Sequence, residues 1–285
     1  GDGDLDLSLI GETVDDDGQP LRIARIYGND AGGIFSEYRT ADQQLAGVYF
    51  GDLSWADYDG DGDLDLAIAG WNAENRESLQ LYTNEEGTLD PSERFLDLDR
   101  RQIDTSGLSA LKGVRYAALA WADYDNDGDL DLIVSGMEEN GTSLTLLYRN
   151  EEGVLQIDDT NSESLVNLHN GDLAWADYDG DGDIDLLARF GSDLVYYENT
   201  GLAIPRFEIR QMVIQKVGIA PALVDYDSDG DLDVFVGGHN ISPENLLLHS
   251  DLVETGVVTF HEILLGVQGT AHSGITWADA DNDRD

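Results

Sequence analysis

The chain has 285 residues, of which 41% are hydrophobic, and it carries a formal net charge of −44 from 59 acidic and 15 basic residues. A surface this acidic repels nucleic acids and anionic membranes, because contacts to phosphate need lysine or arginine, and it favours bound cations. The chain has no cysteine, which excludes disulfides and thiolate-bound metals, and no apolar run approaches the ~18–20 residues of a membrane helix.

An aspartate-rich segment recurs along the whole sequence. Because the chain opens on its second half, "GDGDLDL", rather than on methionine, we expect a piece of a longer protein. Full copies begin at residues 55, 121, 175 and 223, as in "WADYDGDGDLDL", and a shorter copy, "WADADNDRD", ends the chain. The first aspartates of successive copies lie 48 to 66 residues apart. A period of this length predicts repeated structural units rather than two unrelated domains.

Each unit repeats the same order of elements. A short apolar stretch such as "GVYFGDLSWA" precedes the aspartate loop, and a run such as "LDLAIAG" follows it. The small residues between large ones in that run, such as Ala67 and Ala69, predict a strand packed on both faces. Next comes a strand in which a tyrosine stands two residues before an asparagine and a glycine follows, a pattern typical of a turn. A last strand follows, as in "RFEIRQMVI".

Four antiparallel strands in a unit of this length predict an all-β fold, a β-propeller whose blades have the aspartate loop between their first and second strands. A β-helix needs a shorter period, and sandwich domains need ~100 residues each. We therefore expect one propeller domain over residues 1–285. Its units span approximately 1–46, 47–112, 113–168, 169–216 and 217–270, with a partial unit at 271–285.

The two chain ends leave the size of the ring open. The first unit lacks its first strand and the last has little else, so the C-terminal strand could complete the N-terminal blade in a ring of about five. Alternatively, this chain is part of a larger ring.

The alternating aspartates predict sites for calcium. Hard cations such as Ca²⁺ take six to eight oxygen ligands in flexible geometry, whereas Mg²⁺ demands a stricter octahedron, and zinc or copper would need histidine or cysteine. Side chains are expected to ligate from loop positions 1, 3, 5 and 9 and the main-chain carbonyl from position 7, with glycine at position 6 allowing the bend. The predicted metal residues are Asp57, Asp59, Asp61, Asp63 and Asp65; Asp123, Asp125, Asp127, Asp129 and Asp131; Asp177, Asp179, Asp181, Asp183 and Asp185; and Asp225, Asp227, Asp229, Asp231 and Asp233.

These about four complete sites are joined by two partial ones, near Asp2–Asp6 and near Asp279–Asp285, where Arg284 replaces the glycine. The loops are not EF-hands, because position 12 is Ile68, Val134, Ala188 or Val236 in place of the glutamate that an EF-hand requires. The alternative to a metal site is a solvated acidic turn, which four copies at blade spacing disfavour.

The "DYDGDGDLDL" loops and the tyrosine–x–asparagine turns resemble the FG-GAP/VCBS repeats, the blades of integrin α-subunits and of many bacterial surface proteins. This resemblance spans nearly all 285 residues. It implies an extracellular, secreted or cell-surface, calcium-loaded propeller that serves in adhesion, ligand binding or assembly. In some polysaccharide lyases of similar type, the propeller itself carries the active site.

No catalytic or cofactor-binding residue is predicted, because no nucleophile motif, phosphate loop or metalloprotease motif occurs. The recurring Trp55, Trp121, Trp175 and Trp277 are expected to pack between blades, since Leu223 takes the same place in one unit, whereas Trp71 could line a binding face. His249 is aligned with the tyrosine of other units and is expected to pack.

Three functions remain open at this point. The first is a non-catalytic, calcium-binding propeller for adhesion, recognition of a protein or carbohydrate ligand at the cell surface, or surface assembly. The second is an enzyme, of lyase type, that acts on polysaccharides, although the scattered arginines disfavour an acidic substrate. The third is a subunit of a polymeric surface fibre. No direct insertion into a membrane is expected.

Overall fold

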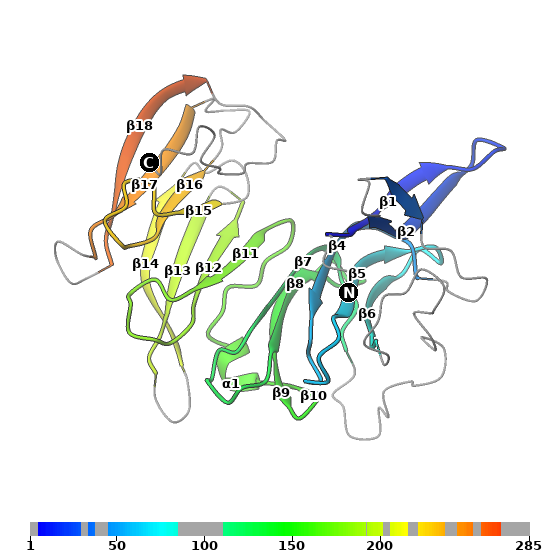
Figure 1. Cartoon of the computed structure of the whole chain (residues 1–285), viewed down its shortest axis with the longest axis horizontal. Coiled ribbons are helices and arrows are strands. Elements are labelled where there is room, and N and C mark those ends of the chain that lie inside the picture. The colour runs from blue at the N-terminus through cyan, green and yellow to red at the C-terminus, as the bar shows by residue number, and fades with distance from the viewer. Residues whose placement is uncertain are drawn as a thin grey trace. The chain divides into compact units, whose positions relative to one another are not determined.

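The computed structural model of the chain describes residues 5–29, 34–37, 45–84, 111–191, 193–201, 206–215, 222–236, 244–252 and 258–268 (Figure 1). They form five antiparallel sheets and one short helix, α1 (Asp159–Ser162). The chain divides into two compact units, the first comprising residues 1–123 and 127–169 and the second residues 124–126 and 170–285.

Three sheets lie in the first unit, each with its strands in sequence order. The first sheet contains β1 (Leu7–Val14), β2 (Pro20–Asn29) and β3 (Phe35–Glu37). The second contains β4 (Val48–Ala56), β5 (Asp65–Asn72) and β6 (Glu77–Tyr82). The third contains β7 (Arg115–Ala122), β8 (Asp131–Met137), β9 (Ser143–Glu151) and β10 (Val154–Ile157).

The second unit holds two four-stranded sheets, again in sequence order. One contains β11 (Asp172–Ala176), β12 (Asp185–Phe190), β13 (Asp193–Asn199) and β14 (Phe207–Gln215). The other contains β15 (Ala222–Val224), β16 (Asp233–Val236), β17 (Glu244–Ser250) and β18 (Phe260–Gln268).

The prediction of an all-β fold built from repeated antiparallel sheets is confirmed. Three sheets have four strands, and the four complete aspartate loops each join the first and second strands of a sheet. The expected fourth strand after β6 falls within residues 85–110, and the strand that would close a ring falls within 271–278; both lie outside the described residues. A closed propeller therefore stays a prediction.

The second strands of the β4–β6 and β7–β10 sheets are buried on both faces, as their small residues predicted. Six consecutive residues of β5, including Ala67 and Ala69, are buried, and six of β8 are buried as well. Ala67 and Ala69 pack in one cluster with Leu132 and Val134 of the next sheet. Small side chains let two sheets approach closely, and this explains why these strands do not alternate apolar and polar residues.

Packing roles are also confirmed for Trp55 and Trp121. Trp55 packs against the cluster that joins the first two sheets, and its indole nitrogen donates to the Ser8 hydroxyl (3.1 Å). Trp121 packs against the next cluster and stacks on Tyr58 with ring centroids 5.9 Å apart. Leu223, at the equivalent position, packs in the core of the last sheet pair. Trp277 lies outside the described residues.

The asparagine of the tyrosine–x–asparagine pattern joins one repeat to another. Asn150, at the end of β9, is fully buried, and its side-chain amide donates to the carbonyl of Tyr58 in the β4–β5 loop (2.6 Å) and to that of Leu130 (3.0 Å). In the second unit, Asn199 donates in the same way to Tyr124 (2.7 Å). A buried side-chain nitrogen that donates to carbonyls of two chain segments fixes how those segments meet.

We expect Asn150→Ala to lower the free energy of unfolding by about 2–3 kcal/mol, because two buried carbonyls lose their donors. Chemical denaturation with calcium fixed would measure the loss. The matched control is Asn84→Ala, since Asn84 donates its side-chain amide only to Leu64 (3.3 Å) in the described structure, and it should cost less than half as much. Equal losses for the two variants would contradict a joining role for Asn150.

Candidate functional site

The four aspartate loops share one backbone conformation. The glycines at position 6, Gly62, Gly128, Gly182 and Gly230, have φ values of 97°, 98°, 96° and 102°. Glycine adopts this region freely, so the predicted role of position 6 in the bend is confirmed. Position 4 is also left-handed, and there two loops use Asn126 (φ 59°) and Ser228 (φ 61°) in place of glycine.

The aspartate at position 1 folds the loop over itself. In the β15–β16 loop, Asp225 accepts the backbone N–H of Asp229 (3.1 Å) on one carboxylate oxygen and that of Gly230 (3.2 Å) on the other. Asp123 and Asp177 accept the equivalent pairs at 3.0–3.1 Å. These contacts hold the other carboxylates on the inner side of a tight turn.

The aspartate at position 9 has a different role, which the sequence did not reveal. It is almost fully buried in every complete loop, with exposed fractions of 0–1% at Asp65, Asp131, Asp185 and Asp233. One oxygen of Asp65 accepts the N–H of Tyr58 (3.1 Å), and the other accepts that of Asn84 (2.7 Å) at the end of the third strand. The same bond comes from the third strand in the other three sheets with a complete loop, ending with Ser250 to Asp233 (2.8 Å). In the first sheet the equivalent donor, Asn29, ends β2 and bonds to Asp6.

Burial changes the acid strength of these position-9 groups. Loss of hydration raises the pKa of Asp65 and of Asp185 from 3.8 to about 7, although the backbone N–H donors oppose the rise. The pKa of Asp233 is raised for the same reason, also against its backbone donors. These carboxyls therefore favour the neutral form more than exposed aspartates do, unless a positive charge lies beside them.

Several clusters of acidic side chains could hold a metal ion. In each of the following groups, the ligand atoms lie within 4.8 Å of one another: Asp57, Asp59 and Asp61; Asp123, Asp125 and Asp127; Asp177, Asp179 and Asp185; and Asp225, Asp227 and Asp229. All donors are oxygens, the ligands that Ca²⁺ prefers. In addition, one buried oxygen of Asp57 and one of Asp229 have no hydrogen-bond partner, a costly state that a bound cation would relieve.

Not every predicted ligand joins such a group. The position-7 residues lie outside the described clusters, and their expected main-chain role stays a prediction: Asp63, Asp129, Asp183 and Asp231. The β11–β12 loop groups its position-9 residue, Asp185, in place of the position-5 residue, Asp181. Asp6 accepts the N–H of Asn29 (2.9 Å), as a position-9 residue does. Asp2, Asp4 and Asp279–Asp285 lie outside the described residues.

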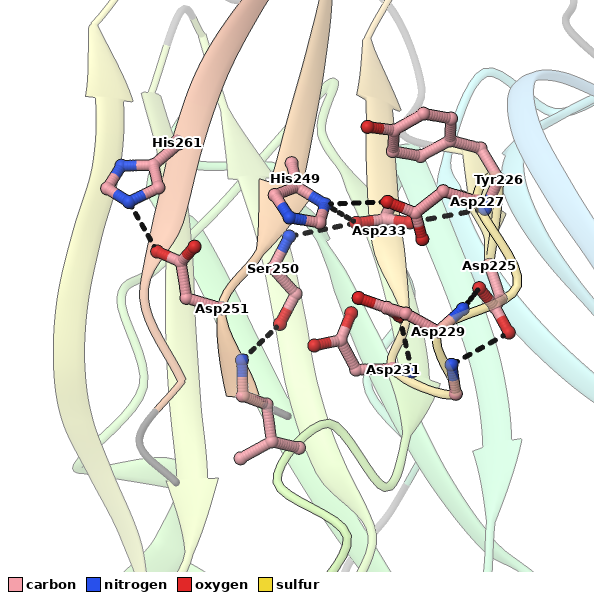
Figure 2. Close-up of polar contacts among 12 residues, drawn as sticks. Asp225, Tyr226, Asp227, Asp229, Asp231, Asp233, His249, Ser250, Asp251 and His261 are labelled. Atoms are coloured by element: carbon pink, nitrogen blue, oxygen red, sulfur yellow. Dashed lines mark hydrogen bonds and ion pairs between the residues drawn. The ribbon is translucent and has the colours of Figure 1, made fainter. Parts of the chain in front are cut away.

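The alignment of His249 with the repeated tyrosine is wrong. Leu248 pairs with Val234, just as Tyr82 pairs with Leu66, so Leu248 holds the tyrosine place and His249 the next one along. Its ring faces the loop carboxylates (Figure 2), with Nδ1 3.2 Å from Asp233 and 3.5 Å from Asp227. Counting back from Ser250, which replaces the asparagine, would have shown this.

The residue at the position of His249, directly before the repeated asparagine, lies beside the acidic loop in other repeats too. Arg149 holds that position in the third sheet and contacts Asp127 of its own loop (3.2 Å), whereas Glu198 holds it in the β11–β14 sheet and contributes to raising the pKa of Asp179. The acidic loops therefore differ in the charge placed beside them. Among the other described histidines, His169 contacts Ser143, and His261 contacts Asp251 outside the loop (Figure 2).

Comparisons with known proteins find a known repeat in part of the chain. Residues 57–134 and 123–188 match the FG-GAP-like repeat. Cartilage acidic protein 1 of Xenopus tropicalis is 29% identical over 152 residues and that of Homo sapiens 27% over 147 residues. Each match takes in 50% of this chain and about a fifth (21% and 20%) of those proteins.

A solved structure has a similar fold. It is that of an Agrocybe aegerita lectin that specifically recognises non-reducing terminal N-acetylglucosamine. The likeness covers 93% of this chain and 67% of the lectin, with a TM-score of 0.51 and 16% identity. No helix among the described residues is long and apolar enough to cross a membrane.

We expect the calcium-free protein to lose stability as the pH rises from about 4 to about 8. An acid whose pKa is raised on folding stabilises the folded state below its unfolded pKa, and that contribution is lost as the pH passes the folded value of about 7. Melting of chelator-treated protein in about 1 M NaCl, where exposed charges are screened beyond about 3 Å, isolates this burial effect. A melting temperature that is flat or rises over this range would contradict it.

Proposed function

The chain carries FG-GAP-like repeats, and from this premise we propose that it is a calcium-stabilised β-propeller, a single domain over residues 1–285. We further propose that it acts outside the cell and binds a protein or carbohydrate ligand in adhesion, recognition or surface assembly. The observation that carries the proposal is the fourfold recurrence of one loop, each copy gathering three carboxylates within 4.8 Å.

Calcium would be held by the predicted aspartates of these loops. Its charge would offset the repulsion among them, and its coordination would satisfy oxygens such as those of Asp57 and Asp229 that hydrogen bonds leave unpaired. Extracellular calcium modules bind with dissociation constants of about 10⁻⁴–10⁻³ M, so such loops would fill outside the cell. Binding to the folded state alone would then raise stability.

Support for ligand binding comes from the fold and its relatives. Repeated sheets of this kind expose many connecting loops on a rigid framework, which suits recognition. The structural neighbour is a lectin, which agrees with a carbohydrate among the candidate ligands. The high negative charge disfavours polyanions as ligands.

A charge-neutralising substitution separates a calcium site from a solvated acidic turn. Burial raises the pKa of Asp179 to about 6, and the charge of the neighbouring Asp181 contributes to the rise. We expect Asp179→Asn to raise the melting temperature without calcium, because a poorly tolerated charge is removed. With millimolar calcium the same variant should melt below the wild type, because it lacks a ligand, and calorimetry should count one ion fewer.

The control is Asp193→Asn, a half-buried residue at the start of β13 that belongs to no acidic loop. It should change neither the ion count nor the difference between the two melting temperatures. If Asp179→Asn shifts stability by the same amount with and without calcium, the loop is an acidic turn and the proposal fails.

A further inference from the structure

Two strands that lead into acidic loops, β4 and β7, each carry a β-bulge near the end away from the loop. In β4, Phe50 and Gly51 together lie opposite a single residue, Gly70, because the register shifts there. In β7, Tyr116 and Ala117 share a single partner residue in the same way. Since the loops follow the far ends of these strands, the bulges lie at the end of the sheets away from the loops.

Both bulges place an aromatic residue in a left-handed backbone conformation. Phe50 has φ 48° and Tyr116 has φ 52°. A bulky residue is a genuine outlier in this region, whereas asparagine tolerates it. The chain itself shows the unstrained choice, because Asn170, which also stands five residues before the repeated tryptophan, has φ 53°. Strain that the chain could avoid at low cost points to a function for the rings.

The two rings belong to a partly exposed row of rings. Phe50 and Tyr116 have centroids 4.5 Å apart, Tyr49 lies against Phe50 at 3.8 Å with the rings tilted by 35°, and His169 meets Tyr116 edge-on at 6.4 Å. Phe50 is 37% exposed, and the others are half-buried. We call these four residues the aromatic surface; all of them lie in the first unit.

Polar groups border the aromatic surface. Arg115 lies over the Tyr116 ring (5.9 Å) and donates to Glu77 (2.9 Å), and Ser143 hydrogen-bonds to His169 (2.6 Å). Glu77 also lines a cleft of about 610 Å³, together with Arg76, Lys112, Gly113, Glu138, Glu139 and Asn140. Trp71 is already stacked, because Arg22 and Arg115 lie over its ring at 4.7 Å and 5.6 Å.

This combination fits the chemistry of a neutral sugar. A pyranose ring has an apolar face of C–H groups that packs on aromatic rings, and hydroxyls at its edge that need donors and acceptors of both kinds. The cleft has the size of a small-molecule site. Its two cations are outnumbered by three glutamates, and Arg115 is paired, so an acidic sugar gains no net attraction. Among the four rings only Phe50 is exposed, and the charged Arg115 and Glu77 lie beside them, which does not suit a hydrophobic protein partner.

We propose that Phe50 and Tyr116 stack against a neutral pyranose whose hydroxyls reach Arg115, Glu77 and the adjoining cleft. This inference deepens the proposed ligand-binding function and rests on it. It assigns recognition to the strand ends away from the acidic loops, so that metal binding and sugar binding would use opposite ends of the same strands.

The test uses the calcium-loaded full chain on an array of oligosaccharides with neutral, N-acetylated and uronate termini, followed by calorimetry with the best binder. We expect Phe50→Asn and Tyr116→Asn each to weaken binding at least about tenfold, which corresponds to about 1.4 kcal/mol. Their melting temperatures should be unchanged or raised, because asparagine suits a positive φ. Phe50→Tyr should retain binding, and Phe190→Asn, a matched control on β12 that is also 37% exposed, should not affect it.

The contrary outcomes are distinct. If the wild type binds a glycan and the Phe50→Asn/Tyr116→Asn double variant binds it equally well, the aromatic surface is not the site, although the proposed function stands. If the asparagine variants lose stability along with binding, the rings are structural and the inference fails. If the calcium-loaded wild type binds no glycan, or binds only uronates, the inference of a neutral sugar ligand fails. The calcium experiments on Asp179→Asn still test the calcium-stabilised propeller independently.

Discussion

The architecture depends on one hydrogen-bonded carboxylate, the aspartate at loop position 9. This side chain is acidic, yet in the complete loops it is buried at the base of the loop, where backbone N–H groups from the loop and from the third strand bond to it. The position-9 carboxylate therefore joins three parts of the sheet. They are the end of the first strand, the start of the second strand and the end of the third strand. The pKa values of Asp65 and Asp185 are raised because burial removes a carboxylate from water.

Much of this fold could be predicted from the sequence because the information is repeated. The all-β class, the order of strands, the place of the loops and the doubly buried second strand all follow from patterns that recur in several units. The roles of individual aspartates could not be separated in this way. Asp57 and Asp65 are the same residue type in one alternating run, and only the tertiary structure shows that one is partly exposed at the turn while the other is enclosed beneath it.

The alignment of His249 fails where other residues replace the tyrosine and the asparagine of the repeat. His249 was misaligned because Leu248 replaces tyrosine and Ser250 replaces asparagine, so both anchors of the pattern were missing. The aromatic surface was missed for a different reason. Phe50, Tyr116 and Asn170 stand at the same distance from the repeated tryptophans, but a positive φ cannot be seen in a residue's identity. The presence of either an aromatic residue or asparagine five residues before the repeated tryptophan could have indicated a positive φ at this position.

The hydrogen bond from Asn150 runs from a later repeat to an earlier one. The Asn150 amide reaches backward along the chain, to the carbonyl of Tyr58, and Asn199 reaches back to Tyr124 in the same sense. A ribosome delivers the chain from its N-terminus, and repeats fold as they emerge. The bond from Asn150 to the Tyr58 carbonyl can therefore form only after the third strand of the following repeat has left the exit tunnel. In these two pairs the later repeat supplies a donor to the loop of the earlier one, so a chain stalled in translation between residues 58 and 150 would lack the bond that Asn150 makes to the Tyr58 loop.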